Sequence, residues 1–142
     1  LFRSLSSEIN YQKINVNIIS YNIHGLSNKY LFPEFFEYVC HSEIFVLFET
    51  HVVEERTEQW QKYFKYFDLN WKPATRLGRF WRTSGGCVYG IKKSLREIGI
   101  KHIFKTLNGV DIIVIQTKEK KLVIIPLYVR GEDWHSEFEV VK

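Results

Sequence analysis

Residues 20–26 read Ser-Tyr-Asn-Ile-His-Gly-Leu, and residues 43–51 read Glu-Ile-Phe-Val-Leu-Phe-Glu-Thr-His. Each segment contains an apolar run that ends on one polar residue, Asn22 in the first and Glu49 in the second. Both residue types suit a site that binds a metal ion and a phosphate. The repetition predicts two neighbouring strands that deliver their ends to one site.

The length and composition fit a single domain spanning residues 1–142. The chain contains 45% hydrophobic and 16% aromatic residues, which is enough for a hydrophobic core. It has no apolar stretch of membrane-spanning length and no leader-like segment, which predicts an intracellular protein without a membrane span. Cys40 and Cys87 are too few for a disulfide framework, and we expect both to be packing thiols.

The net charge of +4 is concentrated in the middle of the chain. Between residues 76 and 105, Glu97 is the only acidic residue. The basic residues of this segment are Arg76, Arg79, Arg82, Lys92, Lys93, Arg96, Lys101 and Lys105. Such a segment fits a phosphate-rich partner such as DNA, and it fits a solvated basic face equally well. Charge alone does not separate these two interpretations.

The first half of the chain is predicted to alternate strands with helices. Residues 14–21 alternate as in a strand with one buried face, and the uninterrupted apolar run 44–48 fits a strand covered on both faces. Between them, apolar residues recur at helical spacing over 31–39, with Pro33 in the first turn. A second helix or helical turn is predicted over 54–67.

Strands dominate the prediction for the second half. Trp71 is predicted to open a short strand, and residues 73–82 are predicted to form a basic loop. Ser84-Gly85-Gly86 then precedes a predicted strand over 87–91. Three further strands are predicted over 98–104, 110–117 and 121–128, and the last two are joined as a hairpin. A helix is predicted to begin near Glu132. With about six or seven strands and two or three helices, the predicted class is α+β, or a two-layer sandwich flanked by helices.

Glu49 is the unusual residue of the second segment, because a carboxylate at the end of a buried strand needs a cation or hydrogen-bond donors. Mg²⁺ prefers such oxygen ligands, and one or two protein carboxylates suffice to hold it. The amide of Asn22 can donate to a phosphate oxygen and accept from a neighbour. Considered alone, each residue has a favoured structural interpretation. Glu49 would be a solvated or arginine-paired glutamate at a strand end. Asn22 would be an ordinary turn asparagine before Gly25.

His24 and His51 lie close to these two residues and are candidate ligands or bases. No HxH or HExxH spacing supports a zinc site, so we expect both histidines to have supporting or structural roles. GxSxG, Walker A and GxGxxG motifs are also missing from the sequence. Acyl transfer by an elbow serine, P-loop NTP hydrolysis and dinucleotide binding therefore have no support.

Four segments occur in a characteristic order. They are 21–29 (Tyr-Asn-Ile-His-Gly-Leu-Ser-Asn-Lys), 44–51 (Ile-Phe-Val-Leu-Phe-Glu-Thr-His), 84–89 (Ser-Gly-Gly-Cys-Val-Tyr) and 124–128 (Ile-Ile-Pro-Leu-Tyr). In this order they resemble the endonuclease/exonuclease/phosphatase (DNase I-like) superfamily. Within it, the chain most resembles the apurinic-type endonuclease domain of LINE-like (non-LTR) retrotransposons and their reverse-transcriptase relatives. The resemblance covers residues 14–128.

The resemblance implies a four-layer α/β sandwich with two packed β-sheets, whose C-terminal part is missing here. It implies that Glu49 binds Mg²⁺ or Mn²⁺, that Asn22 orients the phosphate or the metal ion, and that Tyr128 hydrogen-bonds the scissile phosphate. A core aromatic at the end of a strand is an equal alternative for Tyr128. The predicted nucleic-acid contacts are Arg76, Arg79, Arg82, Lys92, Lys93 and Arg130, the last in a segment that departs from the family's proline-rich continuation.

Two later motifs of that family, Gly-Asp-x-Asn and Ser-Asp-His, do not occur in the chain. The missing His–Asp pair would activate the attacking water, and a general base contributes about 10²- to 10⁴-fold to the rate. The chain also begins with Leu1 and contains no methionine. We therefore expect a fragment that is inactive alone and that exposes apolar surface where the rest of the sandwich would pack.

For the intact parent protein, the resemblance implies metal-assisted hydrolysis of a DNA phosphodiester, nuclear residence and, as a further partner, a downstream reverse transcriptase. Two alternatives stay open. The chain could be a non-catalytic nucleic-acid-binding remnant that uses the basic middle segment. It could also belong to a phosphatase or lipid phosphodiesterase of the same superfamily, which would share Asn22 and Glu49 without needing that segment.

Overall fold

The computed structural model describes residues 15–29, 32–77 and 82–128. It combines helices with β-sheets, in agreement with the α+β class. The elements are β1 (Ile18–Asn22), α2 (Pro33–Cys40), β2 (Ile44–Phe48), the 3-10 helices η2 (Glu54–Arg56) and η3 (Glu58–Phe64), β3 (Phe67–Lys72), β4 (Thr75–Leu77), β5 (Arg82–Ser84), β6 (Cys87–Lys92), the 3-10 helix η4 (Lys93–Ile98), β7 (Lys101–Leu107), β8 (Val110–Gln116) and β9 (Lys121–Ile124). Within this part of the chain, no helix has the length and apolar character needed to cross a membrane.

The first sheet has the strand order β1-β2-β6-β3. β1 and β2 are parallel, and Asn22 pairs with Phe48 at their ends. β6 is antiparallel to both β2 and β3, so that Phe48, Cys87 and Lys72 form one row across the sheet. Because the two parallel strands end at the same edge, Asn22 and Glu49 leave the sheet side by side.

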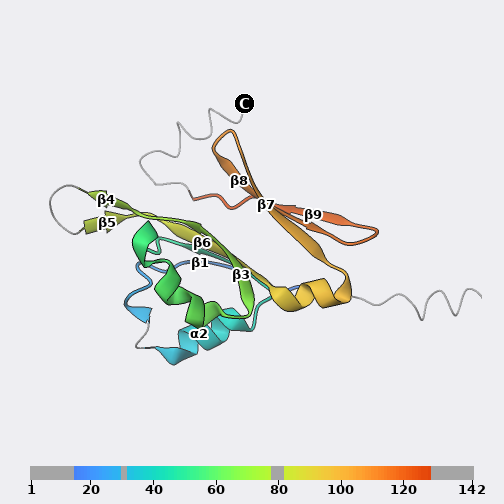
Figure 1. Cartoon of the computed structure of the whole chain (residues 1–142), viewed down its shortest axis with the longest axis horizontal. Coiled ribbons are helices and arrows are strands. Elements are labelled where there is room, and N and C mark those ends of the chain that lie inside the picture. Colours follow the sequence, from blue (N-terminus) through green and yellow to red (C-terminus); the bar gives the residue numbers. More distant parts are fainter. Residues whose placement is uncertain (1–14, 30–31, 78–81, 129–142) are drawn as a thin grey trace, which may run out of the picture.

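Helices cover one face of this sheet (Figure 1). α2 begins at Pro33, whose fixed φ suits the first helical turn, and it buries Phe36 and Val39 against the sheet. From β2, the Phe45 ring lies 5.0 Å from the ring centre of Phe64 in η3. The core on this face consists of Ile23, Leu26, Phe36, Val39, Phe45, Leu47, Val52, Trp60, Phe64, Phe67 and Val88.

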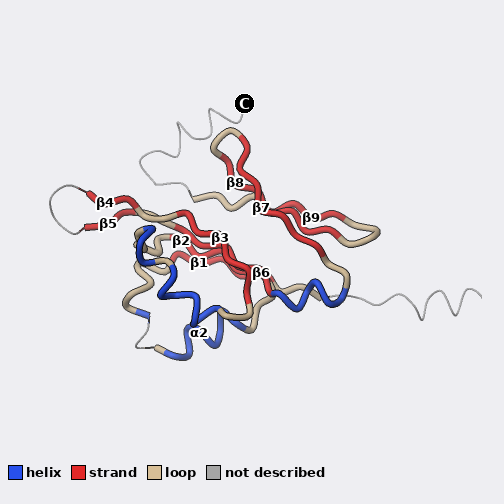
Figure 2. The backbone as a smooth tube through the Cα atoms, viewed as in Figure 1, coloured by secondary structure: helices blue, strands red, loops and turns tan. Residues whose placement is uncertain are grey.

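A second sheet, β7-β8-β9, packs on the opposite face of the first (Figure 2). The core between the two sheets consists of Ile44, Val46, Tyr89, Ile91, Leu95, Ile100, Ile113 and Ile115. Alternate residues of β2 therefore enter different cores, with Phe45 and Leu47 toward the helices and Ile44 and Val46 toward the second sheet. This confirms the prediction of a strand covered on both faces, and it explains why the run is apolar at every position.

Several predicted boundaries differ from the structure. The helix predicted over 54–67 is two short 3-10 helices, η2 and η3, and Phe67 already begins β3. The predicted loop 73–82 contains β4 and the first residue of β5, which pair as an antiparallel hairpin. This pairing joins residues on either side of the intervening segment, so the local composition of the loop did not reveal it. Trp71 lies inside β3 instead of opening a strand.

The last three strands occur near their predicted positions with different bounds. β7 begins and ends three residues later than predicted, and β8 and β9 end earlier than predicted. β7 begins at Lys101 because η4 ends at Ile98 and is capped by Gly99, which has a left-handed φ of +82°. β9 ends at Ile124, two residues before Pro126, which has no N–H to donate to a neighbouring strand. The hairpin predicted between β8 and β9 is confirmed. The helix predicted near Glu132 lies outside the described residues.

Candidate metal and phosphate site

Glu49 lies directly after β2, at the sheet edge where β1 also ends. Its Oε1 accepts a hydrogen bond of 2.5 Å from the hydroxyl of Tyr128, and its Oε2 lies 2.9 Å from Nδ1 of His24. The side chain of Asn22 also hydrogen-bonds to this carboxylate. The Oδ1 atom of Asn22 accepts a hydrogen bond of 3.2 Å from the backbone N–H of His24. Three separate segments of the chain therefore meet at one carboxylate.

The backbone around this carboxylate is strained. His24, Glu49 and His51 adopt left-handed φ angles of +49°, +56° and +56°. In the described part of the chain, the only other non-glycine residue with a positive φ is Asn108, in the turn between β7 and β8. The left-handed conformation costs a residue with a β-carbon roughly 1–2 kcal/mol, and such outliers gather at functional sites. Three of these four positions are thus Glu49 itself, His24 in contact with it, and His51 two residues later.

Backbone hydrogen bonds beyond the strand ends hold this strained loop. The N–H of Gly25 donates to the carbonyl of Glu49 at 2.7 Å, and the N–H of Thr50 donates to the carbonyl of Gly86 at 3.0 Å. Gly86 has a φ of +82°, and a β-carbon there would lie 2.8 Å from Oγ1 of Thr50 and 2.9 Å from the backbone nitrogen of Ala74. The missing side chain of Gly86 therefore leaves room for the segment before β6 to support the loop that carries Glu49.

The neighbours of Glu49 favour its ionised form. The hydrogen bond from Tyr128 has the largest effect and lowers the pKa of the Glu49 carboxyl. Partial burial opposes this shift, while the hydrogen bond from Asn22 and the charges of His24 and His51 reinforce it. The Glu49 side chain is 21% exposed, so an ion from solvent can reach it. The site therefore presents an anionic, accessible carboxylate.

The donor atoms at this site fit an open site for a divalent cation. In the described ranges, no group of three or more His, Cys, Asp or Glu side chains could hold a metal ion. Glu49 and the amide oxygen of Asn22 are oxygen donors, and His24 adds one nitrogen. Mg²⁺ is usually held by one or two carboxylates together with water and substrate phosphate, which matches such a sparse set. A closed, four-ligand zinc site does not match it.

A basic hollow adjoins the strained loop. It has a volume of about 230 Å³ and is bordered by His51, Arg56, Arg76 and Thr83, among others. The hydroxyl of Thr83 in β5 donates to the backbone carbonyl of His51 at 3.1 Å, which ties the β4–β5 hairpin to the site. The Arg76 guanidinium forms an ion pair with Glu55. Two arginine side chains, Arg56 and Arg76, thus border a hollow that His51, two residues after Glu49, also lines.

Among the described residues, those predicted as nucleic-acid contacts do not form one surface. Arg76 in β4 and Arg82 in β5 belong to the hairpin that extends the Glu49 end of the first sheet (Figure 1). Arg79 and Arg130 lie outside the described residues.

Lys92 and Lys93 lie at the other end of the first sheet. Lys92 is the last residue of β6, and a strand rises about 3.3 Å per residue, which places Lys92 roughly 17 Å from Cys87 in the row of Phe48. Its Nζ donates to the carbonyl of Cys40 at 3.1 Å. The basic residues were grouped by their position in the sequence, but the direction of β6 carries these two lysines away from the site.

The sequence did not reveal which of the two candidate histidines contacts Glu49. A supporting or structural role was predicted because the histidines lack zinc-ligand spacing. The structure places the His24 ring directly against Glu49. A local signal was available, since histidine is one of the few residues enriched in the left-handed conformation and His24 lies between Asn22 and Gly25.

Neither a protein-family model nor a curated protein matches the chain. Function is therefore inferred from the side chains that meet at Glu49 and from the layers that position them.

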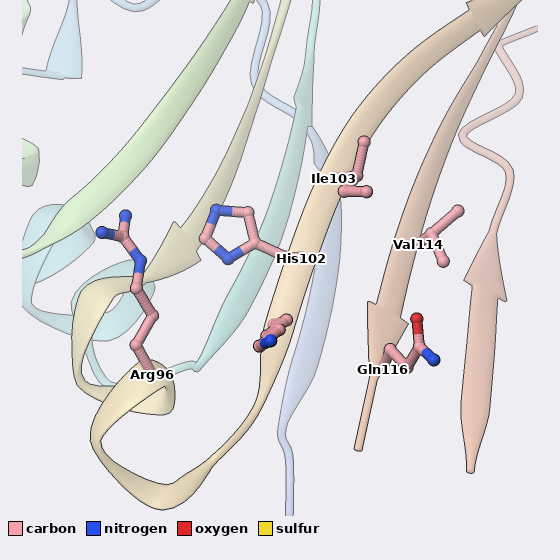
Figure 3. Close-up of a pocket in the computed structure, with 6 residues that line it drawn as sticks. Arg96, His102, Ile103, Val114 and Gln116 are labelled. Atoms are coloured by element: carbon pink, nitrogen blue, oxygen red, sulfur yellow. The ribbon is translucent and has the colours of Figure 1, made fainter. Parts of the chain in front are cut away.

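A second polar cluster lies at the Asp68 end of β3, four register rows from the row that contains Phe48 and Lys72. Asp68 accepts from the guanidinium of Arg96 and lies 3.1 Å from Nε2 of His102. Figure 3 shows His102 and Arg96 close together beside β7, where they border a cavity of about 360 Å³. Burial, helped by the charge of Arg96, lowers the pKa of His102 and so favours the neutral ring. The cluster lies at the opposite end of the first sheet from Glu49, so it is not part of the Glu49 site.

Proposed function

We propose that the chain is part of a divalent-metal-dependent phosphodiesterase domain that cleaves DNA. The proposed type is the endonuclease/exonuclease/phosphatase domain, most like the apurinic-type endonuclease of LINE-like retrotransposons. One observation carries the proposal, namely the convergence of Asn22, His24 and Tyr128 on a Glu49 carboxylate with a strained backbone. A retrotransposon origin would imply nuclear residence and a reverse transcriptase in the same protein.

The layers of the described chain support a partial four-layer sandwich. Helices pack on the first sheet, and the second sheet packs on its other face. On the outer face of the second sheet, Ile103, Val114 and Val123 form one row across β7, β8 and β9. Ile103 is 53% exposed and Val123 is 49% exposed. In a four-layer sandwich, a further helical layer would cover this apolar row.

The residues of the site have complementary roles in this proposal. Glu49 would hold Mg²⁺ or Mn²⁺ together with the amide oxygen of Asn22. A bound divalent cation would neutralise charge that develops on the phosphate and on the leaving oxygen. The hydroxyl of Tyr128, which now donates to Glu49, would donate to a phosphate oxygen. Because Gly-Asp-x-Asn and Ser-Asp-His are missing from the sequence, no residue is assigned to water activation, and cleavage is proposed for the longer protein.

The partner proposed for this site is DNA. Arg56 and Arg76 border the hollow beside Glu49, and Arg82 lies on the strand paired with that of Arg76. Cationic side chains next to a cleavage site can neutralise the flanking phosphates of a nucleic acid and release counterions. Phosphatases and lipid phosphodiesterases of the same superfamily would not require a basic hairpin at this position.

Metal binding by the full chain tests the cation site. Glu43 and Glu49 flank β2 on either side, so Glu43→Gln is a matched control for Glu49→Gln. In titration calorimetry with MgCl₂ or MnCl₂, the wild type and Glu43→Gln should bind one ion with similar affinity. Glu49→Gln should lose at least about tenfold in affinity, because Mg²⁺ relies on few protein carboxylates. Equal binding by Glu49→Gln and the wild type would refute the proposed site.

DNA binding and cleavage test the reaction class. A double variant, Arg76→Ala with Arg82→Ala, should weaken binding to a short DNA duplex and reduce its salt dependence, as measured by fluorescence anisotropy. Lys93→Ala, at the far end of the sheet, should change binding less. Mg²⁺-dependent nicking of supercoiled plasmid by a longer protein that includes the two missing motifs should disappear in Glu49→Ala. An unchanged salt dependence in the double variant would contradict DNA contact by the hairpin.

A further inference from the structure

The ring of His24 faces the same carboxylate that is proposed to hold the cation. Nδ1 of His24 lies 2.9 Å from Oε2 of Glu49, and the His24 side chain is 78% exposed. The backbone N–H of His24 is bonded to Oδ1 of Asn22 at 3.2 Å. His24 is thus connected to both oxygen donors of the site, through its ring to one and through its backbone to the other.

The distance between the His24 nitrogen and the Glu49 oxygen suits two adjacent ligands of one cation. Ligands bound at right angles through bonds of about 2.1 Å lie roughly 3 Å apart. The observed separation of 2.9 Å matches this spacing as well as it matches a hydrogen bond. A cation could therefore replace the shared proton without a large movement of either side chain.

We propose that His24 is a ligand of the cation and that it shifts the selectivity of the site from Mg²⁺ toward late first-row transition metals such as Co²⁺ and Zn²⁺. Mg²⁺ prefers oxygen ligands, whereas imidazole nitrogen suits transition metals, whose affinity for mixed nitrogen and oxygen sites is higher. This inference rests on the proposed function, because it requires a cation at Glu49. Beyond that function, the inference states that one nitrogen donor, from His24, determines which cation the site binds most tightly.

His51 provides a matched control for His24. Both histidines are exposed and have a left-handed φ, and the charge of each favours the ionised form of Glu49. Only His24 forms an ion pair with the Glu49 carboxylate in the described part of the chain. Asparagine is the suitable replacement at both positions, because it tolerates the left-handed conformation and removes the ring.

The test measures the binding of Co²⁺ and of Mg²⁺ to the full chain. Co²⁺ binding is followed by its visible absorption, which reports on its ligands, and Mg²⁺ binding is followed by calorimetry. The wild type should bind Co²⁺ at least about tenfold more tightly than Mg²⁺. His24→Asn should weaken Co²⁺ binding by at least about tenfold and change its absorption spectrum, with Mg²⁺ affinity altered by less than about threefold. His51→Asn should change both affinities by similar factors.

The variants separate failure of this inference from failure of the proposed function. If His24→Asn preserves both the Co²⁺ spectrum and the ratio of the two affinities, His24 is not a ligand, although the cation site at Glu49 still stands. If Glu49→Gln preserves the binding of both ions, the proposed function fails and this inference fails with it. Thermal unfolding followed by circular dichroism verifies that each variant is folded.

Discussion

The hydroxyl of Tyr128 donates a hydrogen bond of 2.5 Å to Oε1 of Glu49, across a separation of 79 residues in the sequence. The Tyr128 ring also stacks on Phe48, with 5.5 Å between ring centres and an interplanar angle of 26°. Phe48 is the last residue of β2, directly before Glu49. The segment after β9 is therefore attached to the end of β2 by one aromatic ring and one hydroxyl group.

Replacing Tyr128 with phenylalanine should raise the pKa of Glu49. The hydroxyl is the strongest of the influences that lower this pKa, and phenylalanine preserves the ring that stacks on Phe48. The titration of ¹³C-labelled glutamate carboxyl groups by NMR measures the shift. Tyr21→Phe, which removes an exposed hydroxyl from β1, serves as the control and should leave the Glu49 titration unchanged.

The same variant should reduce the acid sensitivity of folding. Since the folded-state pKa of Glu49 lies below its ordinary value, the contribution of Glu49 to stability is present above the ordinary value and is lost as pH falls through the lowered pKa. Tyr128→Phe brings the folded-state pKa of Glu49 closer to its ordinary value. The pH range over which Glu49 loses its contribution to stability therefore becomes narrower. An unchanged pKa in Tyr128→Phe would show that the hydrogen bond does not control the carboxylate.

Replacing Gly86 with alanine should destabilise the fold more than replacing Gly99. Both glycines have a φ of +82°, but a β-carbon on Gly99 meets no atom within 4 Å, whereas one on Gly86 meets Thr50 and Ala74. Gly99→Ala should cost roughly 1–2 kcal/mol from backbone strain alone. Gly86→Ala should cost about 1–3 kcal/mol more because of overpacking. Urea unfolding measures both values, and equal losses would contradict the close approach seen at Gly86.

Asp111 should make folding sensitive to acid. Burial would raise the pKa of Asp111, but hydrogen bonds from Tyr89 and Thr106, each 2.8 Å long, and the nearby charge of Lys72 outweigh it and lower the pKa. Between the lowered pKa of Asp111 in the folded chain and its ordinary pKa in the unfolded chain, the unfolded chain binds more protons. The free energy of unfolding should therefore fall as pH drops below about 4, the ordinary range for aspartate.

Asparagine at position 111 should remove this part of the acid dependence. Unfolding by urea at a series of pH values measures the difference in slope between Asp111→Asn and the wild type. Glu97→Gln, at an exposed position of η4, provides the comparison and should preserve the wild-type slope. A full acid dependence in Asp111→Asn would assign the effect to other carboxylates.

The outer face of the second sheet should promote self-association. Ile103 and Val123 flank Val114 in one cross-strand row, and about half of each side chain is exposed. A double variant, Ile103→Thr with Val123→Thr, should shift sedimentation toward the monomer, while the β-branched threonine preserves strand propensity. Ile98→Thr removes a comparably exposed residue from η4 and should have less effect. Persistent self-association in the double variant would implicate another surface.

Local patterns alone predicted much of the secondary structure. The run 44–48 is β2, and the helical spacing over 31–39 corresponds to α2, which begins at Pro33. These predictions succeeded because burial and helical periodicity are expressed over neighbouring residues. The hairpin formed by β4 and β5 was missed, because the basic segment 73–82 has a loop-like composition and each of the two strands has only three residues.

The residue types at the candidate site were also visible in the sequence. Asn22 and Glu49 each end an apolar run, and Tyr128 follows from the ordered segments that carry the family resemblance. Their proposed roles in binding a cation and a phosphate stay predictions. Local hydrophobic patterning therefore revealed which side chains are available at strand ends, because it marks where each apolar run stops.

The meeting of these side chains at one carboxylate depends on the three-dimensional fold. Parallel pairing of β1 with β2 brings Asn22 beside Glu49, and the end of the second sheet brings Tyr128 to the same carboxylate. The left-handed backbone that turns His24 toward Glu49 is held by hydrogen bonds between separate loops. The course of β6 likewise carried Lys92 away from this site. These outcomes depend on strand direction and on long-range backbone pairing, for which no local sequence pattern is sufficient.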